Sequence, residues 1–356
     1  MTDAVPTTEP PLTRPGLTPI ALSLGLGAVG GVVFALLNVP LAWMIGPMVV
    51  NIAASLTGLP VLVPHPFRIV VLCVVGVFLG GAFTPDLIAR AGAWAQSLSL
   101  MLVFVPLICY VGYLYYRNVA GFERNTAAFC GAPGTLSSMI IIGATTGADE
   151  RLITLTQGLR AASVVILMPQ IVSLILPGPQ ITPAMTDAVG AFAWIDTVML
   201  VGAAATGWVI SHVFKLPAAA MAAAMAATAI LYLSGAVTYH PPGAMQSLAF
   251  LVLGSAVGSR FSTVSATTFL RVSKHGLGAT ASMVVVSALF AYGASVLTGT
   301  PFLTELISFT PGGIPEMSLL AVAFGIDPAY VAVHHLTRIA ILVIATPFAA
   351  QMLGGR

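Results

Sequence analysis

Long apolar runs, separated by short polar segments, dominate this sequence from residue 19 onward. Only 7% of the 356 residues are charged and 58% are hydrophobic, whereas soluble domains carry about 25% charged residues. So few charges could not keep the surface of a soluble fold in water, which excludes ordinary cytosolic enzymes and secreted disulfide scaffolds. We also expect no nucleic-acid partner, because phosphate binding needs a basic face and the net charge is +2. The composition predicts an all-α polytopic membrane protein with the lipid bilayer as its main partner.

The two halves of the chain repeat at an offset of about 177 residues, and each half contains five long apolar runs. We therefore divide the chain into a disordered N-terminal tail (1–18), repeat 1 (19–177), a linker (178–191) and repeat 2 (192–352). The clearest repeated element is Gly-x-Asp-x10-Arg, which reads Gly147, Asp149, Arg160 and then Gly325, Asp327, Arg338. The runs cover about 19–37, 41–59, 67–85, 95–116 and 150–176, and then 192–212, 216–234, 244–261, 276–298 and 328–350.

A further apolar segment, interrupted by Gly and Pro, precedes the fifth run of each half, at 129–147 and 302–325. If both segments re-enter the membrane and return, ten Lys and Arg side chains fall on the cytoplasmic side and only Arg90 falls outside. If both cross fully, the split is five to six. Because cytoplasmic loops are enriched in positive charge, we predict ten spans and two re-entrant hairpins, with both termini cytoplasmic in a bacterial inner membrane. Five spans per repeat make the second repeat inverted.

The two hairpin tips are the first candidate for a substrate site. Gly and Pro break the helices there, and irregular backbone survives at membrane depth only inside protein or beside a wet cavity. Helix N-terminal amides at each tip would suit an anion. A structural kink packed against neighbouring helices is the alternative. The candidate tip residues are Gly131, Ala132, Pro133, Gly134 and Thr135 in repeat 1 and Pro311, Gly312, Gly313 and Pro315 in repeat 2, with hydroxyls from Ser137, Ser138 and Ser318.

Arg160 and Arg338 each lie about ten residues into the fifth run, which is ~15 Å along a helix and therefore near the middle of a bilayer. Arginine there costs at least ~2.5–3.5 kcal/mol on insertion scales, so each must face a partner or a cavity. The two side chains could bind the carboxylate, sulfonate or phosphate of a substrate. They could instead cap the carbonyl ends of the broken helices, and the two roles are compatible.

Three further positions carry functional hypotheses. Glu316, the acidic residue at a tip, is a candidate for proton or ion coupling, with pairing to Arg338 or Arg160 as the alternative. Gln157 and His335 occupy matching positions in the two repeats, and one of them is predicted to line the transport pathway. Asp149 and Asp327 precede helices and are predicted to be N-caps.

No catalytic or cofactor-binding motif is visible. His334 and His335 are adjacent, so on a helix they point about 100° apart and do not chelate one metal together. The remaining histidines and the three cysteines show no metal-ligand spacing. Walker, dinucleotide-binding and nucleophile-elbow motifs are absent from the sequence. We therefore predict no metal, no cofactor and no enzyme activity.

Several motifs together resemble the membrane AbrB family over about residues 20–352. They are LAWMIGPM at 41–48, GAPGTL at 131–136, PGGIPEM at 311–317, GID at 325–327 and HHLTRI at 334–339. The resemblance implies an internally duplicated membrane protein. Members of that family carry labels such as regulator of gene expression and proposed ammonia monooxygenase. The inverted organisation also resembles the broad superfamily of cation/proton antiporters and anion transporters in its architecture.

Together these features predict a secondary transporter of elevator type that moves a small organic anion or metabolite with a coupling ion. Arg160, Arg338 and the tips would bind the substrate, and any effect on gene expression would be indirect. A homodimer is compatible with this architecture. A membrane-embedded regulator or sensor without transport is the main alternative. A membrane oxygenase is a weaker one, because no copper-binding histidine cluster is visible in the sequence.

Overall fold

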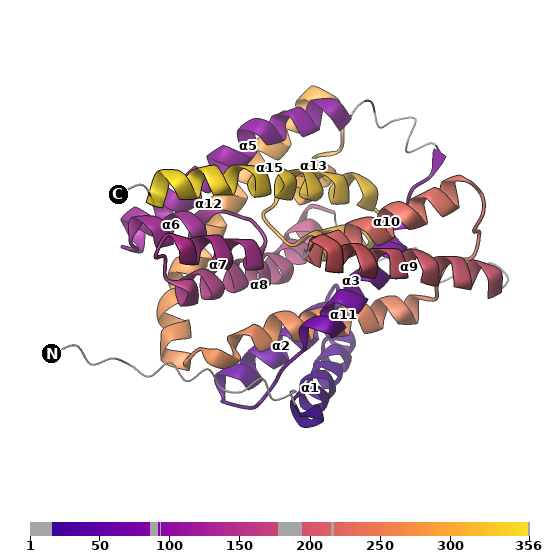
Figure 1. Ribbon diagram of the computed structural model, residues 1–356, viewed down its shortest axis with the longest axis horizontal. Helices are drawn as coiled ribbons and strands as arrows, with labels where there is room; N and C mark the ends of the chain where they lie inside the picture. The colour runs from indigo at the N-terminus through magenta and orange to yellow at the C-terminus, as the bar shows by residue number, and fades with distance from the viewer. Residues whose placement is uncertain (1–15, 86–91, 93, 177–193, 215–216, 355–356) are drawn as a thin grey trace.

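The computed structural model describes residues 16–85, 92, 94–176, 194–214 and 217–354. Within these residues every regular element is helical (Figure 1), as the composition predicts. The predicted tail up to residue 15 and the predicted linker at 178–191 lie outside the described residues.

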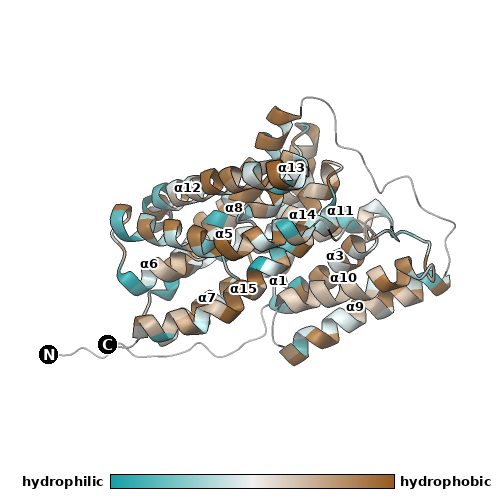
Figure 2. Ribbon diagram, turned by 90° about the horizontal axis from the view of Figure 1, so that it is seen from above, coloured by the Kyte–Doolittle hydropathy of each residue, from teal (hydrophilic) through white to brown (hydrophobic). Residues whose placement is uncertain are grey.

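Six of the described helices are long and apolar enough to cross a membrane. Large apolar side chains on these helices are exposed, for example Leu36 at 77% and Val296 at 70%, as expected for surfaces that face lipid rather than water. Figure 2 shows long hydrophobic stretches along them. The six are α1 (Leu17–Leu36), α5 (Trp94–Leu114), which continues into the π-helical turn η2 (Tyr115–Val119), α8 (Glu150–Ile175), α9 (Trp194–Phe214), α12 (Ala266–Thr298) and α15 (Pro328–Gly354).

The four other predicted spans form shorter helices, so the length criterion is met by six described helices rather than ten. Their 15–17 residues reach about 23–26 Å, less than the ~30 Å of a bilayer core. Turn residues limit each of these helices at one end. Pro64 and Pro242 occupy the N-cap positions of α3 and α11, and Gly58 and Gly235, with positive φ, follow the ends of α2 and α10. The four are α2 (Ala42–Leu56), α3 (His65–Gly80), α10 (Pro217–Leu233) and α11 (Gly243–Gly258), which ends in the 3-10 turn η3 (Ser259–Thr263).

Helix caps follow the sequence closely in both repeats. Asp149 accepts hydrogen bonds from the first-turn N–H groups of α8, and Asp327 does the same for α15, so both predicted N-caps are confirmed. Burial raises the pKa of the Asp327 carboxyl above its ordinary value, while the two backbone N–H groups lower it. Helix α12 begins directly after its N-cap Ser265, about ten residues before the predicted apolar run. These first turns of the helix carry polar residues such as Lys274.

The helices pack into two bodies, and each body draws helices from both halves of the chain. The six-helix body consists of α1, α2, α3, α9, α10 and α11. The hairpin body consists of α5, α8, α12, α15 and two broken hairpins. In Figure 1, α1, α2 and α11 lie below the hairpin body, and α3, α9 and α10 lie beside it.

Small residues bring helices of the six-helix body into backbone contact. A Cβ on Gly76 would lie 2.5 Å from the Met221 carbonyl oxygen of α10, and Gly254 and Gly258 pack equally closely on α2. Such close packing at small residues is typical of helix contacts in membranes. Asn51 is buried and bonded to both Ser23 and Ser255, which joins α1, α2 and α11 by the cross-helix hydrogen bonds expected for a polar side chain in a span.

Two broken hairpins complete the hairpin body, and both break where the sequence predicts. The first consists of α6 (Arg124–Gly131) and α7 (Leu136–Thr145), and the second of α13 (Phe302–Phe309) and α14 (Ile314–Ala323). Half-helices of 8 and 10 residues span only about 12–15 Å. Each pair therefore places its tip inside the protein, where non-helical backbone is shielded.

Candidate functional site

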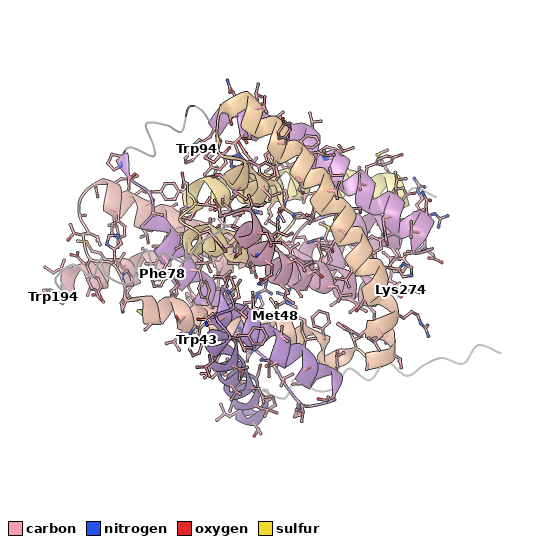
Figure 3. All side chains as sticks on the ribbon, turned by 180° about the vertical axis from the view of Figure 1, so that it is seen from behind. Trp43, Met48, Phe78, Trp94, Trp194 and Lys274 are labelled. Carbon is pink, nitrogen blue, oxygen red and sulfur yellow. The ribbon has the colours of Figure 1, made fainter. Side chains whose placement is uncertain are left out.

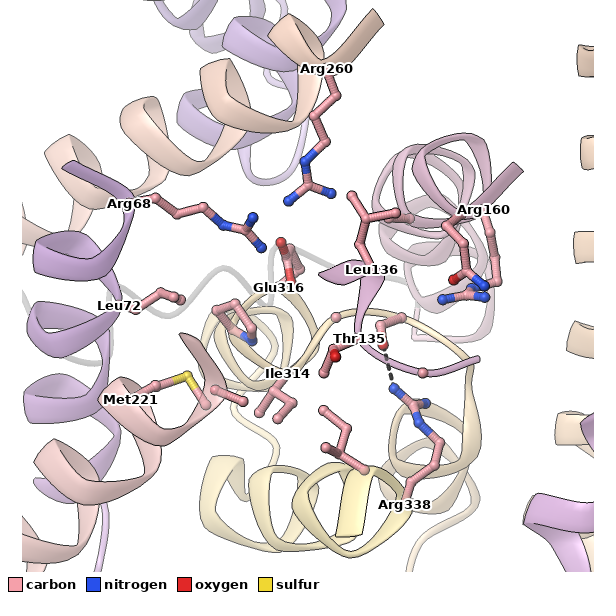
Figure 4. Close-up of a pocket in the computed structure, with 18 residues that line it drawn as sticks. Arg68, Leu72, Thr135, Leu136, Arg160, Met221, Arg260, Ile314, Glu316 and Arg338 are labelled. Atoms are coloured by element: carbon pink, nitrogen blue, oxygen red, sulfur yellow. Dashed lines mark hydrogen bonds between the residues drawn. The ribbon is translucent and has the colours of Figure 1, made fainter. Parts of the chain in front are cut away.

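A cavity of about 120 Å³ lies where the two hairpin tips meet the six-helix body (Figure 4). The hairpin body supplies residues from both tips and from α8 and α15, and the six-helix body supplies residues from α3, α10 and the end of α11. The lining residues are Arg68, Leu72, Gly134, Thr135, Leu136, Gln157, Arg160, Ala161, Ala218, Met221, Arg260, Gly312, Gly313, Ile314, Pro315, Glu316, Arg338 and Ile339.

Arg160 and Arg338 are buried and hold the carbonyl ends of the broken helices. The Arg338 guanidinium donates to the Thr310 oxygen at 2.9 Å and to the Gly312 oxygen at 2.5 Å. Arg160 donates from Nε to Pro311 of the second tip at 3.1 Å and from Nη1 to Ala132 of the first at 3.4 Å. The capping alternative raised from the sequence therefore describes their contacts, and both side chains also line the cavity. Capping and substrate binding remain compatible.

Gln157 and His335 make matching contacts one turn before the two arginines. Gln157 Nε2 donates to the Phe129 oxygen of α6 at 2.8 Å, and His335 Nε2 lies 3.1 Å from the Ile307 oxygen of α13. Gln157 also donates to Ala132 and lines the cavity. His335 is fully buried against its own hairpin and is not among the lining residues.

Glu316 faces Arg68 and Arg260, two arginines that were not among the site residues predicted from the sequence. In Figure 4 the side chains of Arg68 and Arg260, from the six-helix body, point toward the Glu316 carboxylate. No hydrogen bond joins Glu316 to Arg160 or Arg338 in the described residues. Its side chain folds back over Gly313, where a Cβ would overlap the carboxylate. Glu316 interacts electrostatically with Arg68 and Arg260 across the boundary of the two bodies, in place of the pairing with Arg160 or Arg338 suggested from the sequence.

The remaining predicted tip residues divide between lining and support. Gly134, Thr135, Gly312, Gly313 and Pro315 line the cavity. Four others lie behind it: Gly131 packs on the α5 backbone at Tyr113, Pro133 and Ser318 are buried, and Ser138 accepts a hydrogen bond from Thr135 at 2.6 Å. Ala132 and Pro311 contribute the carbonyl oxygens that Arg160 binds, and Ser137 lies in the first turn of α7.

Buried polar atoms without hydrogen-bond partners gather at the tips. Of the six such side-chain atoms in the described residues, three belong to lining residues: Gln157 Oε1, Glu316 Oε2 and Arg338 Nε. Two more, Ser318 Oγ and His335 Nδ1, lie on the same helices. Buried polar groups are almost always satisfied, so the tips combine burial with hydrogen-bonding capacity that the described residues do not use.

The helix ends and side chains together make the cavity electropositive. Arg160 and Arg338 neutralise the carbonyl ends of α6 and α13, whereas the first-turn N–H groups of α7 and α14 have no intrahelical partner. Four guanidinium groups and one carboxylate line the space. This combination favours an anion whose oxygens can accept paired N–H bonds, such as a carboxylate or a phosphate, which arginine binds well.

Arg68 and Arg260 were not predicted to line the site, because the distribution of positive charge places them at the cytoplasmic ends of helices. No repeat relates them, and each sits where a charge ordinarily marks the membrane boundary. Only the packing of α3 and α11 against the second hairpin brings them to the cavity.

The described residues hold no cluster of three His, Cys, Asp or Glu side chains that could bind a metal.

The chain is also similar to known proteins over most of its length. The sequence pattern of a family described as "Transition state regulatory protein AbrB" matches residues 43–354. The chain belongs to the AbrB family. This confirms the resemblance drawn from the motifs, and the matched region includes both hairpins and all four cavity arginines.

Two relatives align along most of their length. One, from Bacillus subtilis (strain 168), bears the name "Uncharacterized protein YhjN" and is 26% identical over 347 residues, which covers 90% of this chain and 89% of the relative. The other, from Escherichia coli (strain K12), has a name that proposes it as a regulator, AbrB. It is 22% identical over 323 residues, covering 90% of this chain and 92% of the relative.

Proposed function

We propose that this AbrB-family protein is a secondary transporter that carries a small organic anion across the membrane. The observation that carries the proposal is the arginine-lined cavity between two helix bodies, closed on one side by two broken-helix tips. Interrupted helices whose N-termini point into a central site are the usual means by which secondary transporters bind anions.

Matching contacts support two copies of one structural unit. Gln157 binds Phe129 as His335 binds Ile307, and Arg160 binds Ala132 as Arg338 binds Thr310, each pair at the same spacing of 178 residues. With five spans in each unit, the second copy would be inverted in the membrane. Inverted repeats with a site at their junction provide alternating access by movement of one body against the other.

The topology predicted from positive charges fits the arrangement of helix ends. In Figure 1 the outer ends of α6 and α7 and the C-terminal end of α15 lie on one side of the molecule. Figure 3 places Lys274 and Trp194 at opposite ends, as expected if one faces the cytoplasm and the other the outside. Arg68, Ala218 and Arg260 reach the cavity from the predicted cytoplasmic ends of their helices. We infer an inward-facing state in which the hairpin body carries the substrate.

The cavity volume limits the substrate class. About 120 Å³ is well below the 300–1,000 Å³ of a drug-sized ligand pocket. It is also several times larger than the ~10–15 Å³ that one water needs. A small carboxylate, sulfonate or phosphate of few carbon atoms fits this volume and the arginine chemistry.

A regulator without transport is the second candidate, because the names of the family and of the Escherichia coli relative point to regulation. Such a protein would bind a ligand in the same cavity and pass the signal to a partner. Binding alone therefore cannot separate the two functions, whereas flux can.

Binding is tested first with purified protein and a panel of small mono- and dicarboxylates, a sulfonate and inorganic phosphate, with amines and neutral solutes as controls. An anion at 100 times its Kd should stabilise the protein by about 2.7 kcal/mol. Arg68→Gln and Arg260→Gln should each weaken that anion by about 10–100-fold, since a charged hydrogen bond contributes ~1.5–3 kcal/mol. Arg271→Gln, an exposed arginine on α12, is the matched control. Stabilisation by amines or neutral solutes alone would overturn the anion assignment.

A further inference from the structure

A second buried polar cluster lies near the start of α13, apart from the cavity. Its centre is Glu305, the fourth residue of that helix, whose side chain has no exposed surface. Ser97 and His334 are also fully buried, and Tyr330 is 3% exposed. These side chains come from the beginnings of α5, α13 and α15, where three helices meet the C-terminal end of α12.

Hydrogen bonds connect the cluster into one chain. Ser97 Oγ lies 2.9 Å from Glu305 Oε2 and 3.0 Å from His334 Nε2. Tyr330 Oη donates to Glu305 Oε1 at 2.8 Å, and Thr298 Oγ1 lies 3.2 Å from the same oxygen. On the far side of its ring, His334 Nδ1 lies 2.8 Å from the Tyr330 carbonyl oxygen.

These hydrogen bonds need one proton more than a neutral His334, the Ser97 hydroxyl and a Glu305 carboxylate supply. The Tyr330 carbonyl can only accept, so His334 Nδ1 must carry a hydrogen. The contacts from His334 Nε2 to Ser97 Oγ and from Ser97 Oγ to Glu305 Oε2 each need a hydrogen, and the serine hydroxyl supplies only one. The other must reside on His334 Nε2 or on Glu305 Oε2.

Both placements leave the cluster electrically neutral, either as an imidazolium with a carboxylate or as a neutral imidazole with a carboxylic acid. Loss of the proton would break one hydrogen bond and leave a net negative charge at a position with no exposed surface. Both changes are costly in a low-dielectric interior. The hydrogen bonds from His334 through Ser97 to Glu305 are therefore complete only when one proton is bound to His334 or Glu305.

We propose that Glu305, Ser97 and His334 form a proton-binding site, and that this proton is the ion that drives transport. The site itself stands on the hydrogen-bond geometry, while the coupling role rests on the proposed transport function. In this proposal the coupling proton binds at the Glu305 cluster rather than at Glu316, the residue that the sequence suggested.

Within the part of the chain that the structure describes, the groups that bond to the cluster from the neighbouring helices are uncharged. On α15, Tyr330 bonds to the carboxylate, and His335 and Arg338 face the hairpin carbonyls instead. From α5 the facing group is the Ser97 hydroxyl, and from the end of α12 it is Thr298. Among the described residues, no Lys or Arg is hydrogen-bonded to Glu305.

Only the second hairpin carries such a site. At the spacing of 178 residues, the counterparts of Glu305, Tyr330 and His334 are Ala127, Leu152 and Thr156. None of these three titrates. The first hairpin reaches the same architecture without them, so the fold of a hairpin does not require the cluster. This asymmetry favours a functional role over a purely structural one.

Two short rigid paths connect the proton site to the substrate cavity. Along α13, Glu305 is five residues, or about 7.5 Å, from the tip residue Thr310. Along α15, His334 is four residues, or about 6 Å, from Arg338, which binds the Thr310 oxygen. A change in the contacts of Glu305 therefore acts on both elements that shape the second tip.

Proton binding is tested without any substrate, by thermal unfolding of the purified protein in lipid nanodiscs between about pH 7 and pH 9. In the unfolded chain Glu and His are deprotonated there, with ordinary pKa values of about 4.3 and 6.5. The folded cluster keeps one proton more, so stability falls as pH rises, by tenfold in the folding equilibrium constant per pH unit for that proton.

Glu305→Gln should abolish this contribution to the pH slope while preserving the fold. Its amide can donate to Ser97 and accept from Tyr330, which reproduces the protonated acid without a titrating group. His334→Gln is the second variant, because its amide can donate to Ser97 and free the serine hydrogen for a charged Glu305. Glu123→Gln, an exposed glutamate, should keep the wild-type slope. Equal slopes in wild type, Glu305→Gln and His334→Gln would overturn the proton site.

Coupling is tested in proteoliposomes with the anion identified by the binding panel. Glu305→Gln should retain exchange of labelled for unlabelled anion but lose accumulation driven by a pH gradient. Accumulation that survives in Glu305→Gln, or that follows a sodium gradient instead, would overturn the coupling role. Absence of flux in the wild type would overturn the proposed function itself, and the pH slope would still decide whether the proton site exists.

Discussion

At the scale of single residues, the four cavity arginines perform two tasks. Arg160 and Arg338 donate hydrogen bonds to the carbonyl oxygens of the tips. They therefore stabilise the broken helices and also contribute positive charge to the cavity. Arg68 and Arg260 have no hydrogen bond to the protein in the described residues and face Glu316 across the cavity. A substrate anion would therefore compete with Glu316 for the second pair.

Arg338→Gln should destabilise the protein strongly. It removes donors to the Thr310 and Gly312 oxygens, and each buried acceptor left unsatisfied costs about 1–3 kcal/mol. Thermal unfolding in detergent measures the loss. The exposed Arg271→Gln should change stability by no more than about 0.5 kcal/mol, and equal melting of the two variants would show that Arg338 does not support the tip.

Glu316→Gln should tighten anion binding, because it removes the negative charge that faces Arg68 and Arg260. We expect a gain of about tenfold in affinity, the equivalent of ~1.4 kcal/mol. A titration of the stabilising anion against wild type and variant measures it. Weaker binding in Glu316→Gln would instead support the direct role in substrate or ion binding that the sequence suggested.

At the scale of elements, much of the hairpin geometry could be predicted because local chemistry determines it. Gly134 and Gly312 lie in breaks that Gly and Pro impose, and Asp149 and Asp327 cap the helices that follow. Arg160, Arg338 and Gln157 could be placed at the tips because the repeat aligns them. The shortness of α2, α3, α10 and α11 was missed, since apolar runs extend into the turns that end these helices.

The parts that could not be predicted depend on contacts between segments far apart in the sequence. Ser97 meets His334 across 237 positions, and nothing near either residue signals the other. Glu305 lies in an apolar run as an isolated acid, and Arg68 looks like a boundary charge. In each case the packing of helices, rather than a motif, creates the chemistry.

Gly254→Ala should separate α11 from α2 and destabilise the six-helix body. A Cβ there would overlap the Met44 carbonyl, and backbone cannot yield as a flexible side chain does. Overpacking of this kind costs about 1–3 kcal/mol. Gly293→Ala on α12, where nothing lies within 4 Å, is the matched control. It should be neutral or stabilising by up to ~1 kcal/mol, and an equal effect of both changes would contradict the close packing.

At the scale of the whole molecule, the cavity belongs to neither body alone. Arg160, Arg338 and Glu316 belong to the hairpin body, whereas Arg68 and Arg260 belong to the six-helix body. Displacement of one body against the other would therefore remove two of the four charges from the substrate. That change in affinity between states is what a transporter requires to release its cargo.

The most direct test of the account is uptake of the panel-identified anion into proteoliposomes that contain the purified protein. We predict saturable uptake and exchange by the wild type and by Arg271→Gln. Uptake by Arg68→Gln and Arg260→Gln should fall by about 10–100-fold at anion concentrations below Kd. An anion that binds the wild type in this cavity and yet never crosses the membrane, whichever gradient is imposed, would contradict transport and favour a membrane-embedded sensor.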